Sequence, residues 1–157
     1  MPSLIMSAPF SNAAPKSAPL KKIQLSESSG SLERGSDTNT FKCLLVDDNV
    51  DLLEMTADLF RDAGFEVFTA VSGKEALQIL KSNPSIDAVL TDVVMPGMSG
   101  LELGHEVRKH YPSISVILVS GYPNPASVAG HGSVHHFPFV QKPYRTDQVI
   151  RLLIKTN

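Results

Sequence analysis

The sequence lacks cysteine pairs, and this excludes a disulfide-stabilised scaffold. Its single cysteine, Cys43, cannot form an intramolecular disulfide, so we expect a reducing, cytoplasmic setting. Cys43 lies in an apolar run that is typical of a strand. We therefore expect it to be buried as a small apolar side chain, rather than exposed as a reactive thiol.

The sequence also lacks a strong net charge and any long hydrophobic run. A formal charge of -2 gives no electrostatic reason to expect binding to nucleic acid or to an anionic membrane. The apolar residues of Met1–Phe10 are interrupted by Pro2 and Pro9, and no basic residue precedes them. They suit neither a signal peptide nor a membrane span, and we expect no transmembrane segment.

Residues 1–40 differ in composition from the rest of the chain. They are rich in Ser, Pro, Ala and Asn and show no sustained hydrophobic period. Such a segment cannot bury enough apolar surface to offset the entropy lost on ordering. We predict a flexible leader over 1–40, with a docking peptide around Leu20–Leu25 as the alternative, and one folded domain over 41–157.

From Phe41 onward, short apolar runs alternate with amphipathic stretches. The runs predict buried parallel strands, and the stretches between them predict helices. Pro138, inside the last run, indicates an edge strand. The expected strands are 41–46, 66–71, 88–92, 114–120 and 137–141, and the expected helices begin near Asn49 or Asp51, after Ser72, at Gly100 and near Asp147.

Three positions predict where helices begin and end. Ser72 with Glu75, and Ser99 with Glu102, have the spacing of capping boxes. Gly64 stands where a left-handed residue ends a helix. Strands and helices that alternate at this spacing predict an α/β fold, with an open, doubly wound parallel sheet and helices on both faces.

Polar residues follow the predicted strands. Asp47 and Asp48 follow the first, Asp92 ends the third, Ser120 ends the fourth, and Lys142 lies just past the fifth. Right-handed crossovers bring the carboxyl ends of parallel strands to one edge, where ligands bind in such sheets. We therefore expect these five side chains to converge on one crevice.

The residue types at this edge suit phosphoryl transfer. Three neighbouring carboxylates repel one another and favour a hard divalent cation, and Mg²⁺ fits best because it accepts carboxylate, carbonyl, water and phosphate oxygens. A lysine adds a mobile positive charge, and a hydroxyl adds a hydrogen-bond donor. In phosphoryl transfer, the protein mainly positions the reactants and neutralises charge.

Four motifs resemble those of receiver domains from two-component systems. They are Val46-Asp47-Asp48-Asn49, the loop from Thr91-Asp92 to Ser99-Gly100, Val119-Ser120-Gly121, and Gln141-Lys142-Pro143-Tyr144. Their order and spacing agree over 41–157. The resemblance implies a flavodoxin-like, five-stranded sheet with strand order 2-1-3-4-5.

The resemblance also implies the role of each site residue. Asp92 would be the phosphorylated nucleophile, and Lys142 would pair with the phosphoryl group, with a cis bond before Pro143. Mg²⁺ would be bound directly by Asp48, Asp92 and the carbonyl of Val94, and through water by Asp47. Ser120 and Phe139 would act as the switch, with the hydroxyl drawn toward the phosphoryl group and the ring turned inward.

On this interpretation the chain is a phosphoacceptor response regulator of a two-component system or phosphorelay. Its donor would be a phosphohistidine on a sensor histidine kinase or a histidine phosphotransfer protein. It would signal through protein–protein contacts to an unknown target, without contacting nucleic acid or membrane. We expect no enzyme activity beyond catalysis of its own phosphorylation and dephosphorylation.

The sequence departs from the family between the fourth and fifth strands. Residues 121–133 hold two prolines and three glycines among few helix formers, so we predict a fourth helix that is short or irregular. His131, His135 and His136 lack accompanying ligands and indicate a plain loop. An apolar Val94 and a bulky Tyr122, at the positions flanking the phosphoryl group, suggest slow self-dephosphorylation.

Other interpretations fit less well. A phosphoaspartate hydrolase of the haloacid-dehalogenase type requires an acid two residues after its nucleophile, and this chain has Val94 there. A flavodoxin-like cofactor binder requires a Gly/Ser/Thr-rich first loop, whereas this chain has Asp-Asp-Asn. A degenerate receiver would lack a site residue, and none is missing.

The output of the domain stays open at this point. Because the chain ends soon after the last predicted helix, we expect no attached DNA-binding or catalytic effector. The remaining choices are a stand-alone regulator, a phosphate sink or relay intermediate, and a receiver of the type fused to hybrid histidine kinases.

Overall fold

The computed structural model describes residues 40–123 and 136–156, which form five strands and four helices. The strands are β1 (Lys42–Val46), β2 (Glu66–Ala70), β3 (Ala88–Asp92), β4 (Ser115–Ser120) and β5 (Phe139–Gln141). The helices are α1 (Val50–Asp62), α2 (Gly73–Ser82), α3 (Gly100–His110) and α4 (Thr146–Thr156).

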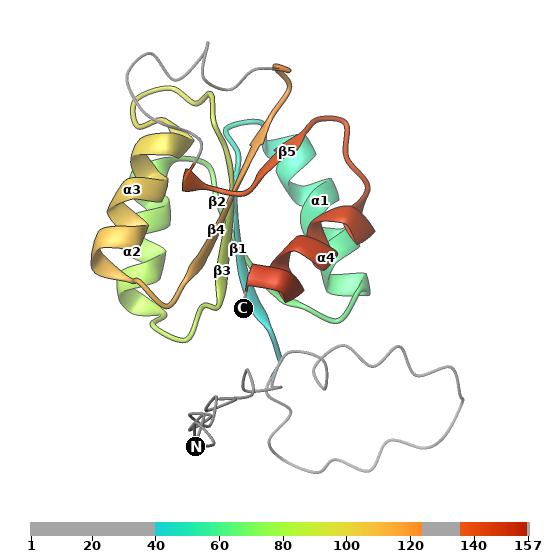
Figure 1. Cartoon of the computed structure of the whole chain (residues 1–157), viewed down its shortest axis with the longest axis horizontal. Helices are drawn as coiled ribbons and strands as arrows, with labels where there is room; N and C mark the ends of the chain where they lie inside the picture. The colour runs from blue at the N-terminus through green and yellow to red at the C-terminus, as the bar shows by residue number, and fades with distance from the viewer. Residues whose placement is uncertain (1–39, 124–135, 157) are drawn as a thin grey trace, which may run out of the picture.

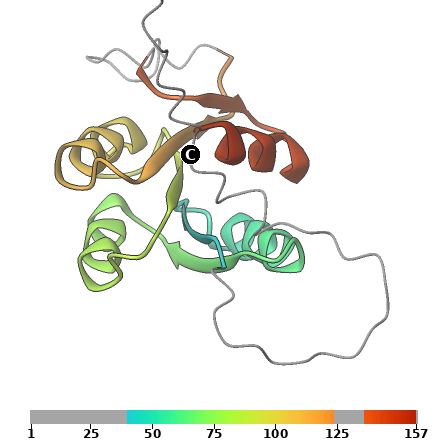
Figure 2. The ribbon, with the colours of Figure 1, turned by 60° about the horizontal axis from the view of Figure 1, so that its bottom comes forward.

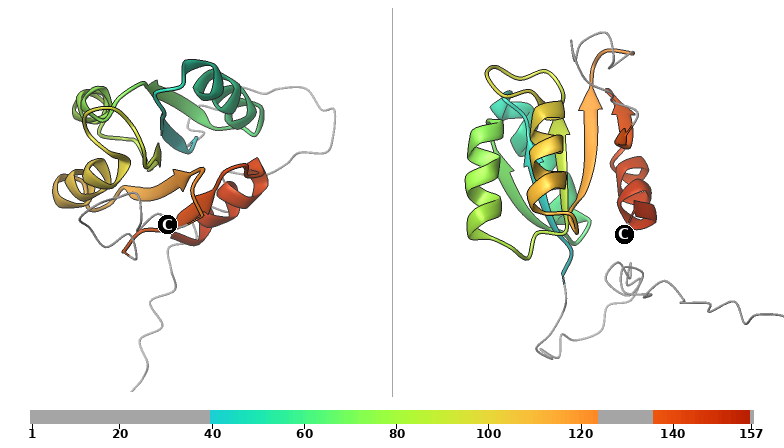
Figure 3. Two further views of the ribbon diagram at one scale, coloured as in Figure 1. Left: turned by 90° about the horizontal axis from the view of Figure 1, so that it is seen from above. Right: turned by 60° about the vertical axis from the view of Figure 1, so that its left-hand side comes forward.

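The strands form one parallel sheet in the order β2-β1-β3-β4-β5. Helices α2 and α3 cover one face, and α1 and α4 cover the other (Figure 1). Figure 2 and the left view of Figure 3 show the same three layers, with the sheet between two pairs of helices. The predicted fold class and strand order are confirmed, as is the edge position of β5.

Most of the predicted helix ends are found. Asn49 caps α1, its side chain accepting from the Leu52 N–H at 3.1 Å, and Gly64 has a φ of 92° just after the helix. Ser99 and Glu102 form both halves of a capping box at the start of α3.

The capping box predicted at Ser72 is half correct. Its Oγ accepts from the Glu75 N–H, but the Glu75 carboxylate accepts from the N–H of Val71, one residue earlier than the motif requires. The Glu75 side chain therefore ties the end of β2, and not the N-cap residue, to the first turn of α2.

The fifth strand is shorter than predicted, because Phe137 and Pro138 lie before it. Pro138 has no N–H to donate to a ladder, although its carbonyl still accepts from the Leu118 N–H at 2.9 Å. Phe137 is buried against α3, with the Arg108 guanidinium 4.0 Å from its ring centroid.

Each face of the sheet buries its own apolar cluster. Because side chains alternate along a strand, Leu44 and Val46 of β1 join the cluster beneath α2 and α3, whereas Cys43 and Leu45 join the one beneath α1 and α4. In α1, Leu53, Ala57 and Phe60 are buried, whereas Leu59 is 50% exposed.

We expect the Cys43 thiol to resist alkylation in the folded protein. It is fully buried, as predicted, and burial, with a smaller contribution from the Asp87 charge, raises its pKa to about 12. Since the thiolate is the reactive form, iodoacetamide at mildly alkaline pH should leave Cys43 unmodified by mass spectrometry. The same reagent should label it fully in guanidinium. Labelling of the folded protein at the denatured rate would contradict this prediction.

Two predictions fall outside the described residues: the flexible leader over 1–40, apart from Thr40, and the short or irregular helix within 121–133, from residue 124 onward. Among the residues described, no helix has both the length and the apolar character to cross a membrane.

Candidate functional site

The five polar residues predicted to converge do meet at one edge of the sheet. Pairing aligns Val46 with Thr91, Asp92 with Val119, and Ser120 with Gln141. The residues at or just after these strand ends therefore lie at the same height along the strand direction. Lys142 is held there by its backbone N–H, which donates to the carbonyl of Ser120 at 2.7 Å. The Lys142–Pro143 bond is cis, as the resemblance implies.

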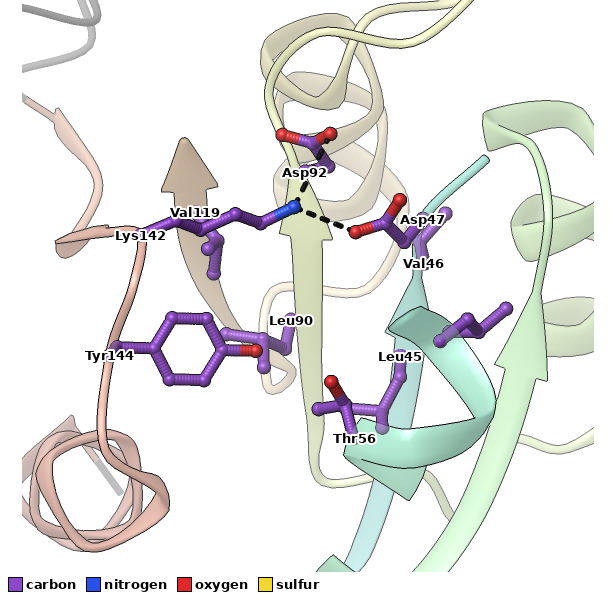
Figure 4. Close-up of a pocket in the computed structure, with 10 residues that line it drawn as sticks. Leu45, Val46, Asp47, Thr56, Leu90, Asp92, Val119, Lys142 and Tyr144 are labelled. Atoms are coloured by element: carbon purple, nitrogen blue, oxygen red, sulfur yellow. Dashed lines mark hydrogen bonds and ion pairs between the residues drawn. The ribbon is translucent and has the colours of Figure 1, made fainter. Parts of the chain in front are cut away.

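The Lys142 ammonium lies between two carboxylates (Figure 4). Its Nζ is 2.8 Å from Oδ2 of Asp47, to which it donates a hydrogen bond, and 3.6 Å from Oδ2 of Asp92. All three side chains are largely buried, so their charges interact more strongly than they would in water. The lysine therefore offsets part of the repulsion between the two acids.

The surroundings of Asp92 make its ionised form less favourable than it would be in water. Burial raises the pKa of its carboxyl, and the neighbouring charges of Asp47 and Asp48 raise it further, against the opposing effects of Lys142 and of the Val94 N–H. For Lys142, burial lowers the pKa, but the hydrogen bond to Asp47 and the charges of both acids outweigh it and leave that pKa raised. The ammonium is thus fixed in its charged form.

Asp47, Asp48 and Asp92 form a group that could hold a metal ion. One oxygen from each carboxylate lies within 4.8 Å of the others. Asp47 is buried, Asp92 is half-buried and Asp48 is exposed, so the group opens to solvent on one side. An all-oxygen donor set of this kind suits Mg²⁺ better than a softer metal.

The backbone beneath Asp92 is packed tightly. The Thr91 hydroxyl donates to the Asp92 carbonyl at 3.0 Å, and the Val93 N–H donates to the carbonyl of Val119 at 2.8 Å. Gly100, the first residue of α3, leaves no room at this point, because a Cβ there would lie 1.9 Å from the Asp92 carbonyl oxygen. The start of α3 therefore fixes the end of β3.

The predicted switch residues, Ser120 and Phe139, lie on β4 and β5. Ser120 is fully buried, and its Oγ accepts from the Tyr122 N–H at 3.2 Å, which leaves the hydroxyl proton available to donate. Phe139, on β5, is half-buried against the cluster beneath α2 and α3. Val94 and Tyr122, predicted to flank the phosphoryl group, are 43% and 55% exposed.

The sequence analysis missed four residues that shape the site. Thr91 and Gly100 set the backbone under Asp92, and Thr56 and Tyr144 line a cavity of about 20 Å³ together with Asp47, Asp92 and Lys142. The Tyr144 ring points from the loop after β5 toward α1, where Thr56 lies (Figure 4). Burial raises the pKa of Tyr144, so its hydroxyl stays neutral.

Of the three histidines noted in the sequence, the structure describes His136. His136 is exposed, and its carbonyl accepts a hydrogen bond from the Arg108 guanidinium. His131 and His135 lie outside the described residues.

Comparison with known proteins identifies the family to which this fold belongs. The family model for the response regulator receiver domain matches residues 43–154. The chain belongs to the receiver-domain family. Receiver domains are phosphoacceptor modules of two-component signalling that bind Mg²⁺ at an acidic site, and the cluster of Asp47, Asp48 and Asp92 is consistent with such a site.

Individual relatives agree with this assignment. The receiver is 33% identical over 138 residues to the sensor kinase CckA of Brucella abortus, which covers 87% of this chain and 14% of that protein. It is 42% identical over 79 residues to a response regulator receiver protein of Anaeromyxobacter, covering 50% of this chain and 33% of that protein. The chain thus spans a third or less of the length of these curated relatives.

Solved structures match about three quarters of the chain. The response regulator TrrA of Thermotoga maritima, in complex with Mg²⁺ and BeF, has a TM-score of 0.66 at 29% identity, covering 75% of this chain and all of that one. The receiver domain of the hybrid histidine kinase CckA has a TM-score of 0.60 at 29% identity, covering 73% of this chain and 96% of that one.

Proposed function

We propose that Asp92 accepts a phosphoryl group from a phosphohistidine, carried by a sensor histidine kinase or a histidine phosphotransfer protein. The observation that carries the proposal is the Lys142 ammonium, 2.8 Å from Asp47 and 3.6 Å from Asp92, facing three clustered carboxylates at the carboxyl edge of the sheet. The relation to CckA, a sensor kinase, supports a donor of this class.

In the proposed step, a carboxylate oxygen of Asp92 attacks phosphorus and forms an acyl phosphate. The N–P bond of the phosphohistidine breaks, and the imidazole nitrogen keeps the electron pair and takes a proton from solvent. Lys142 places its charge next to the incoming phosphoryl oxygens, where negative charge increases. Because Lys142 already contacts Asp92, this charge is in place before the donor arrives.

The acidic group is proposed to hold Mg²⁺ through Asp48, Asp92 and the Val94 carbonyl, with Asp47 acting through water. When bound, Mg²⁺ neutralises charge on the phosphoryl oxygens and on the three acids. The raised pKa of Asp92 supports this assignment, because a bound cation would favour the ionised carboxylate that attacks.

Ser120 and Phe139 are proposed to report phosphorylation. A phosphoryl group adds about two negative charges and three acceptor oxygens, and the buried Ser120 hydroxyl has a proton to donate. Moving Ser120 would change the packing beside β5, where Phe139 is only half-buried and would turn inward. The signal would then pass by protein–protein contacts, with the domain catalysing only its own phosphorylation and dephosphorylation.

Phosphoryl transfer to the full chain should require Mg²⁺ and give an acyl phosphate. Incubation with a labelled phosphohistidine donor and Mg²⁺ is expected to label the chain, and EDTA is expected to reduce labelling to background. The bound label should be released by hydroxylamine, which cleaves acyl phosphates. Label that enters equally well in EDTA, or that resists hydroxylamine, would overturn the proposal.

The phosphorylated domain is expected to keep its label for minutes or longer in Mg²⁺ alone. Val94 has no polar group with which to orient water toward phosphorus, Tyr122 is bulky, and both stand exposed. Val94→Asn, which supplies a polar group, should shorten the lifetime. Val71→Asn, at a valine of similar exposure that follows β2, two strands from β3 in the sheet, should not. Loss of label from the unaltered protein within seconds would refute the expectation.

A further inference from the structure

A groove of about 440 Å³ lies between α1 and the segment joining β5 to α4. We call it the α1 groove. Its walls are mainly apolar, and Lys142 reaches it from the phosphorylation site; the lining residues are Leu52, Met55, Thr56, Leu59, Lys142, Pro143, Tyr144 and Thr146. Met55 and Leu59, one turn apart on α1, are 59% and 50% exposed. Adjacent large apolar side chains on a surface mark a contact site.

One rim of the α1 groove is acidic. Helix α1 carries four acids against a single arginine, Arg61, which pairs with Glu54 and Asp58. Asp51 and Asp62 form no ion pair within 40–123 and 136–156. At 100° per residue, both project close to the direction of Met55, so unpaired negative charge borders the exposed apolar side chains.

The chain itself contains a segment of complementary chemistry. Residues 1–26 include three lysines and no acid. Two of these lysines stand inside the sequence Leu20-Lys21-Lys22-Ile23-Gln24-Leu25, which also holds three large apolar residues within six positions. The apolar stretch near the N-terminus, around Leu4–Met6, has no charge beside it. Residues 20–25 therefore combine apolar side chains that suit the walls of the α1 groove with positive charges that complement its acidic rim.

The connection between the two is long enough. Fifteen residues separate Leu25 from Phe41, and such a chain can span about 50 Å when extended. Helix α1, with 13 residues, is only about 20 Å long. A tether of this size gives an effective concentration in the millimolar range, so a contact too weak to hold two separate molecules together would still form within one chain.

We propose that residues 20–25 bind in the α1 groove of the same molecule. Leu20 and Ile23 place apolar side chains against Met55 and Leu59, and Lys21 and Lys22 face Asp51, Asp58 and Asp62. Because Lys142 lines the same groove, the bound segment lies beside the phosphorylation site. The contact itself does not depend on the proposed function.

Zero-length carbodiimide cross-linking of the full chain, read by mass spectrometry, tests the contact. We expect links from Lys21 or Lys22 to Asp51, Asp58 or Asp62, in monomeric protein, with a yield that does not change on dilution. In Leu20→Ser/Ile23→Ser, which keeps both lysines, the yield should fall at least about fivefold, as expected when apolar side chains lose their burial. The matched control, Leu4→Ser/Ile5→Ser, should keep the yield.

Each other result counts against the proposal. Absence of these links would overturn it, and so would links formed mainly to acids outside α1. A yield that falls on dilution would identify a second copy as the occupant, and an unchanged yield in Leu20→Ser/Ile23→Ser would show charge attraction without a seated segment. Because no step uses phosphoryl transfer, failure of the proposed function would leave this measurement unaffected.

Discussion

Asp92→Asn is expected to abolish phosphoryl transfer to the chain and, at the same time, to stabilise the fold. The amide nitrogen that replaces one carboxylate oxygen is a poor nucleophile, and a neutral side chain is a weaker ligand for a divalent cation. Label from a phosphohistidine donor in Mg²⁺ should therefore fall to background. The substitution conserves shape, so the α/β fold is retained.

The expected gain in stability follows from the raised pKa of Asp92. A carboxyl group with a higher pKa in the folded state than in the unfolded state makes folding less favourable once it ionises. Its contribution to stability is present below the unfolded pKa and is lost as pH rises through the folded pKa. Asp92→Asn removes this loss, so its Tm should exceed that of the unaltered protein at neutral pH, without Mg²⁺, and the difference should disappear in acid.

Lys142 does not cancel this gain in the variant. Its Nζ keeps the shorter contact, 2.8 Å, to Asp47 when Asp92 becomes neutral. Glu66→Gln, at an exposed acid at the start of β2 and thus at the opposite end of the sheet from Asp92, is the matched control and should change neither labelling nor Tm appreciably. Full labelling of Asp92→Asn would refute Asp92 as the acceptor, and a lower Tm at neutral pH would refute the account of its electrostatics.

Much of the fold could be predicted because local signals and burial agree. The apolar runs ending in Val46, Asp92 and Ser120 are strands in the structure, with ends where the polar residues begin. Parallel pairing then brings Asp47, Asp92, Ser120 and Lys142 to one edge, since each follows or ends a strand. The convergence therefore depended only on strand positions and on the handedness of the crossovers.

The details that depend on contacts between distant segments could not be predicted. Nothing in the sequence indicates that Lys142 lies closer to Asp47 than to Asp92, because this depends on the path of the loop after β5. Leu59 is a large apolar residue on an amphipathic helix, but the groove beside it leaves half of that side chain exposed. In the sequence, Gly100 is simply a glycine that follows an N-cap serine. Only the packing of α3 against β3 shows that a side chain at this position would collide with the Asp92 carbonyl oxygen.

Gly100→Ala is expected to be among the most destabilising single substitutions in the domain. The new Cβ would lie 1.9 Å from the Asp92 carbonyl oxygen and 3.0 Å from the Thr91 Oγ1. The obstacle is backbone at the end of a central strand, so relief requires α3 to shift away from β3. That shift would strain the bond from the Gly100 N–H to the Val93 carbonyl, now 2.9 Å. We expect a loss of about 3 kcal/mol or more in the free energy of unfolding.

Chemical denaturation of the unaltered and Gly100→Ala proteins measures this loss, and Gly121→Ala provides the matched control. A Cβ at Gly121 meets no atom within 4 Å, and its φ is not in the left-handed range, so the same change there should alter stability by less than about 1 kcal/mol. Near-equal stability of the two variants would contradict the close packing of α3 on β3. Because the shift would also move the Asp92 carbonyl, any folded Gly100→Ala protein should accept a phosphoryl group more slowly, whereas a purely global loss of stability would leave the rate per folded molecule unchanged.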